Sequence, residues 1–177
     1  MGFSVNLQVQ DDVGGNDDAN GYIDVTFYKR YHQNRGRDVS NQDTNSIKAG
    51  IVRATDYLDE RWQFVGEKLQ LDDQSTEWPR LNAYDIDDNY IDGIPKEVKE
   101  ATAEYAFLAQ SRIELFESPT RDASGRVVQS RSETVGPLSE SVQFTPGAAF
   151  ELPKYPRADR KLVARGLVLQ RGVLYRG

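Results

Sequence analysis

The sequence predicts a mainly α-helical protein: a small helical bundle with an extended β-like insertion and with N- and C-terminal arms. Two segments carry apolar residues at helical spacing. Between about residues 119 and 153, glycine and proline divide the chain into short extended pieces, which indicates the insertion. We therefore expect these parts: an N-terminal arm at 1–21, a helical domain at 22–166 and a C-terminal tail at 167–177.

The N-terminal arm is expected to begin as a strand. Apolar and polar residues alternate from Phe3 to Val9, the period of a half-buried strand. Residues 11–21 are acidic and rich in glycine and asparagine, as in a loop. A short helix should follow, because Asp24 is a good N-cap and Gly36 a good terminator.

Three further helices are predicted from spacing and from proline. A helix over about residues 43–62 is predicted from its apolar face, formed by Ile47, Ile51, Ala54, Leu58 and Trp62. Pro95 fits the first turn of the next helix, whose apolar stripe continues to Phe116. A short basic helix is expected over about residues 157–167, with Leu162 and Val163 facing inward. In the insertion, Val127–Val128 and Val142–Phe144 can pair as a hairpin.

The composition bounds the chemistry. The 177 residues contain no cysteine, which excludes disulfides and thiolate metal sites, and His32 is the single histidine. The segment Asp85–Asn89 resembles the start of a calcium-binding loop. Tyr90 stands where that loop needs glycine and Lys96 where it needs glutamate, so an exposed acidic loop is expected instead. No phosphate-cradling loop and no membrane-spanning apolar run are present, and we expect no catalysis, cofactor, metal or membrane partner.

The segment Trp78-Pro79-Arg80 lies within a long polar connection, and it has two readings. Proline fixes the backbone, so Trp78 can anchor a contact with a partner while Arg80 presents its donors. Trp78 can equally fill this protein's own core. The candidate interface residues are Trp62, Trp78, Pro79, Arg80, Tyr105, Arg157, Arg160, Arg165, Arg171 and Arg176.

Charge is spread unevenly along the chain. Residues 1–120 hold 23 acidic and 12 basic side chains, whereas residues 121–177 hold 5 and 10. The basic C-terminal part also carries tyrosines, and such a mixture is typical of proteins that bind single strands. Against this, the whole chain has a net charge of −6, and a DNA-binding domain is usually basic. The basic and aromatic residues in question are Lys154, Tyr155, Arg157, Arg160, Lys161, Arg165, Arg171, Tyr175 and Arg176.

An ordered set of motifs resembles a known family. Ile51 to Asp59 precede Trp78-Pro79-Arg80, which is followed by Asp92-Gly93-Ile94-Pro95, by Ser132 to Leu138 and by Tyr155-Pro156. This order resembles the head–tail connector (adaptor, or head-completion) proteins of tailed phages, whose relatives are often described as DnaT-like single-stranded-DNA-binding proteins. The resemblance covers roughly residues 20 to 165.

The resemblance implies a structural virion protein made in the host cytoplasm and located in the neck, at the head–tail junction. It would form a dodecameric ring with copies of itself, bind the portal protein and give tail or neck proteins a docking platform. Double-stranded DNA would pass through the ring, and an acidic channel would keep that DNA mobile. The alternative is a sequence-independent single-stranded-DNA-binding protein.

Overall fold

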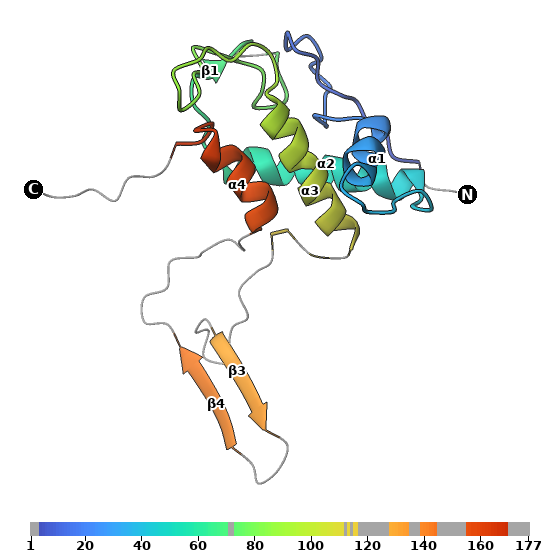
Figure 1. Ribbon diagram of the computed structural model, residues 1–177, viewed down its shortest axis with the longest axis vertical. Helices are drawn as coiled ribbons and strands as arrows, with labels where there is room; N and C mark the ends of the chain where they lie inside the picture. The colour runs from blue at the N-terminus through green and yellow to red at the C-terminus, as the bar shows by residue number, and fades with distance from the viewer. Residues whose placement is uncertain are drawn as a thin grey trace, which may run out of the picture. The chain divides into compact units, whose positions relative to one another are not determined.

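The chain is mainly helical, as predicted, with four helices and a two-stranded antiparallel hairpin in the described residues (Figure 1). It divides into two units, one formed by Met1–Leu115 with Lys154–Gly177 and the other by Phe116–Pro153. Strands β3 and β4 are described by their backbone alone. The computed structural model describes residues 4–70, 73–111, 113, 115–116, 128–134, 139–144 and 155–169.

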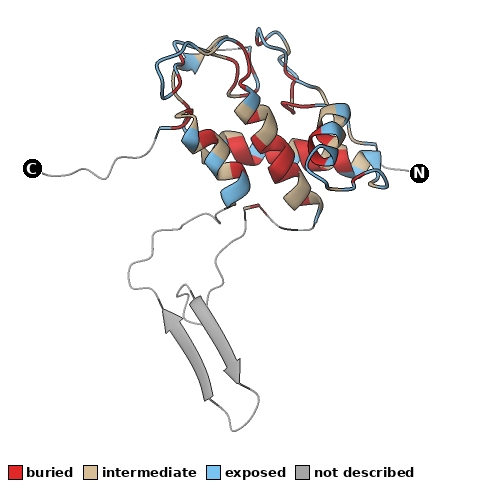
Figure 2. Cartoon of the chain, in the orientation of Figure 1, coloured by how far each residue is buried: buried red, intermediate tan, exposed pale blue. Residues whose placement is uncertain are grey.

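The first unit is built on four helices and one short strand pair. Helices α2 and α3 pack against each other, α4 packs on α3, and α1 contacts both α2 and α3. Buried residues concentrate where these helices meet (Figure 2). The elements are α1 (Val25–Gln33), α2 (Thr44–Arg61), β1 (Glu67–Lys68), β2 (Arg80–Leu81), α3 (Lys96–Gln110) and α4 (Pro156–Ala164). None of the helices in the described part of the chain is long and apolar enough to cross a membrane.

Close contact between α2 and α3 depends on Gly50. A Cβ atom there would lie 2.9 Å from the carbonyl oxygen of Ala106 and 2.9 Å from the Gln110 side chain. The small residue lets the two helices approach, and the face that carries Ile47, Ile51 and Leu58 is fully buried. The periodicity that predicted α2 therefore identified its buried face correctly.

The helix ends follow their caps. Asp24 caps α1 as predicted, with its carboxylate accepting from Phe27 N at 2.6 Å. The prediction for α3 was too long, because the helix ends at Gln110 and not at Phe116. The N–H of Ile113 donates to the carbonyl of Leu108, which closes the helix, and Ile113 is left 40% exposed. Pro95 lies one residue before α3 instead of in its first turn.

The strand predicted in the N-terminal arm is not formed by residues 4–9. Only a single bridge joins Val9 to Gly21 there. Side-chain bonds organise this segment instead: Gln8 N donates to Asn20 Oδ1 at 2.8 Å, and Asn20 Nδ2 donates to the carbonyl of Asn6 at 2.9 Å. Polar side chains that satisfy backbone groups locally compete with strand pairing, which explains the difference.

The hairpin expected in the insertion is present in the second unit. Strand β3 (Val128–Thr134) pairs antiparallel with β4 (Ser139–Phe144). Val128 lies opposite Phe144, and Arg131 lies opposite Val142. The two extended pieces thus pair around Val128 and Val142–Phe144 as their sequence indicated, while Val127 lies outside the described residues.

Candidate functional site

Trp78 fills the core of this protein. Its side chain is 0% exposed and packs edge-on against Phe64, with ring centroids 5.7 Å apart. Its backbone N–H donates to the hydroxyl of Tyr22 at 3.1 Å, and its carbonyl accepts from Thr76 Oγ1 at 2.8 Å. An indole enclosed in this way offers no surface to a partner, so of the two readings the structure matches the internal one.

Arg80 is likewise occupied within the chain. Its guanidinium donates to the carbonyls of Val65 and Gly66, each at 2.8 Å, and pairs with Glu77 at 2.7 Å. The planar donor fork therefore joins the loop to the preceding turn and does not project into solvent. Pro79, which follows Trp78, is buried with it.

The remaining candidate residues fall into three groups. Tyr105 is buried, and its hydroxyl donates to Asp159 at 2.6 Å. Trp62 is half-buried, and its Nε1 donates to the Tyr105 hydroxyl at 3.2 Å. The exposed candidates on α4 are Arg157 and Arg160. Two others lie outside the described residues: Arg171 and Arg176.

The half-buried residue Asp59 holds the Trp78 loop in place through its carboxyl group. Asp59 accepts a hydrogen bond from the Tyr22 hydroxyl at 2.5 Å and another from Glu77 N at 3.1 Å. Burial raises the pKa of Asp59 to about 7, against the stabilising effect of those two hydrogen bonds on the charged form. This carboxyl has a structural role and faces the core.

Cations from three elements converge on Glu100, on the outer side of α3. Its carboxylate pairs with Lys161 of α4 at 2.5 Å, with Arg35 after α1 at 3.2 Å and with Lys96 of α3 at 3.8 Å. Burial raises the pKa of Glu100, but these cations outweigh burial and the pKa is lowered overall. One carboxylate cannot neutralise three cations, so this place has a surplus of positive charge.

Aromatic rings lie beside this surplus. Phe27 and Tyr31, one turn apart on α1, are stacked with their planes 11° apart and their centroids 6.4 Å apart. The guanidinium of Arg35 lies 3.6 Å from the centre of the Tyr31 ring, and Lys161 lies 5.4 Å from it. Arg30 lies 5.7 Å from the centre of the Phe27 ring. We call this group the Glu100 surface; it consists of Phe27, Arg30, Tyr31, Arg35, Lys96, Glu100 and Lys161.

Helix α4 extends the Glu100 surface with the basic residues that the sequence analysis singled out. Helices α3 and α4 run antiparallel here, because Lys161 pairs with Glu100 while Arg165, one turn later, approaches Glu97 at 3.8 Å. Arg157 is exposed one turn before Lys161, and Arg160 is exposed beside it. Neither arginine has an ion pair in the described part of the chain.

Arg165 is different from these two arginines. It pairs with Asp85 at 2.7 Å and lies 4.0 Å from Asp87, so its charge is matched by carboxylates. It also fixes the acidic loop, since the carbonyl of Arg165 accepts from Ile86 N at 3.1 Å. Of the candidate arginines that the structure describes on α4, only Arg157 and Arg160 are available to an anion.

The acidic loop presents a second pair of rings, Tyr84 and Tyr90. These are 49% and 53% exposed and meet edge-to-face at 5.7 Å. Asp85 anchors the loop by accepting from the backbone of Asp87 at 2.8 Å and of Asn89 at 2.9 Å. Its oxygens are thus already engaged, and the described residues contain no group of side chains arranged to hold a metal ion. Surrounding carboxylates make these tyrosines a poor site for a phosphate backbone.

Comparison with known proteins decides the family. A family model described as "Putative DnaT-like ssDNA binding protein" matches residues 5–173. The chain belongs to this family. Neither the curated proteins nor the solved structures contain a significant match to it.

Membership of this DnaT-like family corrects the head–tail connector interpretation. The prediction of a portal-binding virion ring was wrong. The partners predicted for it were also wrong: further copies of the same chain, the portal protein, tail or neck proteins, and double-stranded DNA in its channel. Two of the motifs behind it are structural: Trp78 and Pro79 are buried, and Ile94 and Pro95 are buried before α3. Such residues specify a fold and carry no information about a partner. The alternative named above, single-stranded DNA binding, agrees with the family.

Most of the Glu100 surface was not selected from the sequence. Of its seven residues only Lys161 was a candidate, and the six that were missed are Phe27, Arg30, Tyr31, Arg35, Lys96 and Glu100. The spacing of Phe27, Arg30 and Tyr31, at intervals of three and four residues, could have placed them on one helix face. Their approach to Lys161 could not have been inferred, because it depends on how α1 and α4 pack around α3.

Proposed function

We propose that this protein binds single-stranded DNA through the Glu100 surface and the exposed arginines of α4. The observation that carries the proposal is the match of nearly the whole chain to a DnaT-like single-stranded-DNA-binding family. The role is one of binding and includes no catalytic step.

The chemistry of the Glu100 surface supports this role. Proteins that bind single strands combine a positively charged track for the phosphates with aromatic side chains on which bases stack. Lys96 has a side chain that is 79% exposed and an ion pair of 3.8 Å, so it can exchange its carboxylate partner for a phosphate at little cost. Arg157 and Arg160 need give up no ion pair. Phe27, half-buried beside Arg30, provides the ring.

An acidic body then confines the strand to this surface. The net charge of −6 disfavours phosphate over most of the molecule, and Tyr84 and Tyr90 are surrounded by carboxylates. Binding should therefore depend steeply on salt, because each phosphate contact releases counterions. A protein with a local basic track and a negative remainder binds the strand in one place and repels it elsewhere.

The test is fluorescence anisotropy with a labelled oligonucleotide of about 15 nucleotides, near the upper site size of a single-strand-binding module. Titrations between about 50 and 200 mM salt give the dependence of affinity on salt. The site variant is the double substitution Lys96→Gln and Arg157→Gln. The control is Lys48→Gln with Arg53→Gln, which removes the same charge from the outer side of α2.

We expect the site variant to bind more weakly. The slope of log affinity against log salt concentration should also become shallower, by about 0.7 for each phosphate contact that is lost. The control should keep the wild-type slope, because its cations lie away from the Glu100 surface. Equal losses in the two double variants would mean that net charge alone drives binding, and the proposed surface would be wrong. Absence of salt-dependent binding by the wild type would reject the function itself.

A further inference from the structure

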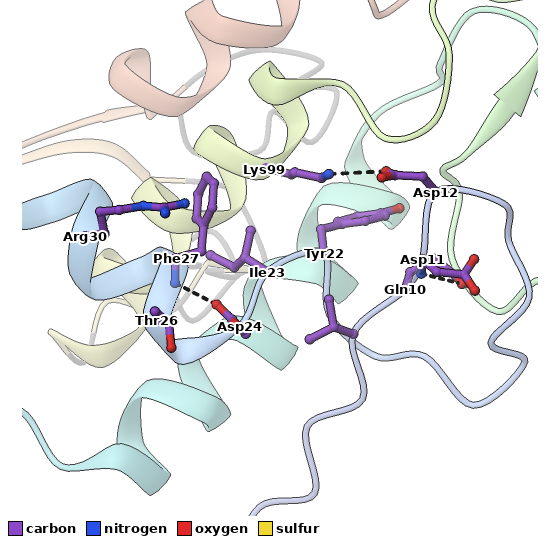
Figure 3. A pocket seen from close by; sticks show the side chains of 11 residues that line it. Gln10, Asp11, Asp12, Tyr22, Ile23, Asp24, Thr26, Phe27, Arg30 and Lys99 are labelled. Atoms are coloured by element: carbon purple, nitrogen blue, oxygen red, sulfur yellow. Dashed lines mark hydrogen bonds and ion pairs between the residues drawn. The ribbon is translucent and has the colours of Figure 1, made fainter.

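A hollow of about 500 Å³ lies between α1 and the N-terminal segment, next to the Glu100 surface (Figure 3). Its floor is formed by Tyr22 and Ile23, which are 1% and 2% exposed. Its volume falls within the range of small-ligand sites, about 300 to 1,000 Å³. The residues around the hollow are Val9, Gln10, Asp11, Asp12, Tyr22, Ile23, Asp24, Thr26, Phe27, Arg30 and Lys99.

One wall of the hollow is a ring with a cation against it. Phe27 and Arg30 extend from the same side of α1, with the guanidinium directed at the ring (Figure 3). On the opposite side, Lys99 pairs with Asp12 at 3.2 Å, and Asp12 also accepts from the backbone of Ile94 at 3.1 Å. The hollow is thus bordered by an organised ion pair on one side and by an aromatic ring on the other, and it is open to solvent.

The rim is rich in hydrogen-bond acceptors. Asp24 uses Oδ1 to cap α1 at Phe27 N, which leaves Oδ2 for other donors. Asp11 similarly uses Oδ1 to accept from the backbone of Val13 and Gly15. Thr26 adds an exposed hydroxyl. Carboxylates repel phosphates but accept hydrogen bonds from the amino groups of bases.

The hollow and the Glu100 surface share Phe27 and Arg30, and the second ring of the stacked pair, Tyr31, is buried beside them. Phe27 lines the hollow and stacks on Tyr31, which is in contact with Arg35 and Lys161. A strand whose phosphates follow the cations would therefore pass the mouth of the hollow with its bases free. A base turned inward would meet the Phe27 ring and the acceptor-rich rim.

We propose that this hollow receives one unstacked nucleobase of the bound strand, with Phe27 against its face and the carboxylates of the rim accepting from its exocyclic amino group. The inference rests on the single-stranded DNA binding proposed above. It adds a preference among bases: cytosine, which has an amino group, should bind better than thymine, which is of the same ring size but has none.

The experiment compares three labelled oligonucleotides of about 15 units: oligo-dC, oligo-dT and a chain of abasic sugar-phosphates. The proteins are wild type, Phe27→Leu, Asp24→Asn and the control Tyr84→Leu, which removes an exposed ring from the acidic loop. Asparagine is also a good N-cap, so Asp24→Asn preserves α1 while it changes the rim. Circular dichroism verifies that each variant is folded.

For the wild type we expect affinity to decrease from oligo-dC to oligo-dT and then to the abasic chain. Phe27→Leu should weaken the two base-bearing strands about five- to tenfold, near the lower end of the effect of losing one stacked base. It should leave the abasic chain unchanged. Asp24→Asn should bring oligo-dC and oligo-dT closer together, and Tyr84→Leu should change nothing.

The outcomes separate this inference from the proposed function. If the wild type binds all three chains equally and with steep salt dependence, single-strand binding stands and the base site is wrong. If Phe27→Leu weakens the abasic chain as much as the others, Phe27 supports the surface and contacts no base, which also overturns the inference. If no chain binds, both proposals fail.

Discussion

Replacing Asp59 by asparagine should remove a pH-dependent loss of stability. The carboxyl of Asp59 lies under the Trp78 loop, and burial raises its pKa from 3.8 to about 7. Between about pH 4 and 7 the folded protein therefore retains a proton that the unfolded chain has released. Because the folded state binds more protons in this window, the free energy of unfolding falls as the pH rises through it. This contribution is fully present below about pH 4 and is lost above about pH 7.

The magnitude follows from the shift. A difference of about three pH units, at 1.36 kcal/mol per unit, gives about 4 kcal/mol between the two ends of the window. That is a large part of the stability of a typical domain, about 5–15 kcal/mol. Asparagine is close in shape to the neutral acid and does not titrate. The free energy of unfolding of Asp59→Asn should therefore not decrease between about pH 4 and 7 in the way that the wild type's does.

The assay is urea unfolding followed by tryptophan fluorescence, at a series of pH values from about 4 to 8, which span the window. The quantity of interest is the difference in unfolding free energy between wild type and variant, because the other carboxyl groups are common to both proteins. Glu60→Gln, which removes an exposed carboxylate from the next position of α2, is the control and should follow the wild type. If the wild-type and Asp59→Asn profiles remain parallel across the range, burial does not raise the pKa of Asp59 and the prediction is wrong.

Three further predictions concern other contacts. Trp78→Ala should lower the free energy of unfolding, measured by urea titration, by about 3–5 kcal/mol, the usual cost of removing a large aromatic side chain from a core. A small loss of stability would show that the Trp78 side chain is not enclosed. Gly50→Ala should lower it by about 1–3 kcal/mol, because the new methyl group would meet the Ala106 carbonyl, and a gain in stability would contradict the close approach of α2 and α3. Glu100→Gln should strengthen the binding of oligo-dT at low salt, because Arg35, Lys96 and Lys161 lose their carboxylate partner and can pair with phosphates instead. Weaker binding by the folded variant would count against the Glu100 surface.

The sequence alone determined the local elements. Periodic apolar residues identified α2 and its buried face, Asp24 identified the start of α1, and the valines of the insertion identified the β3–β4 hairpin. These features depend on neighbours within a few residues, so their pattern is visible in the chain. The end of α3 was misplaced because an apolar stripe can continue after the backbone has turned, as Ile113 and Phe116 show.

Tertiary structure decided what the conspicuous residues do. Trp78 and Arg80 could equally have been anchors for a partner or parts of the core, and only their contacts with Tyr22, Val65 and Glu77 settle that they are internal. In the same way, Arg157 and Arg165 are alike in sequence, yet Asp85 neutralises one and leaves the other available. The Glu100 surface joins residues from α1, α3 and α4 that are far apart in the chain. Lys96 lies four residues before Glu100 on α3, but Arg35 and Lys161 reach this carboxylate only because the helices pack together, and no local pattern records those two distances.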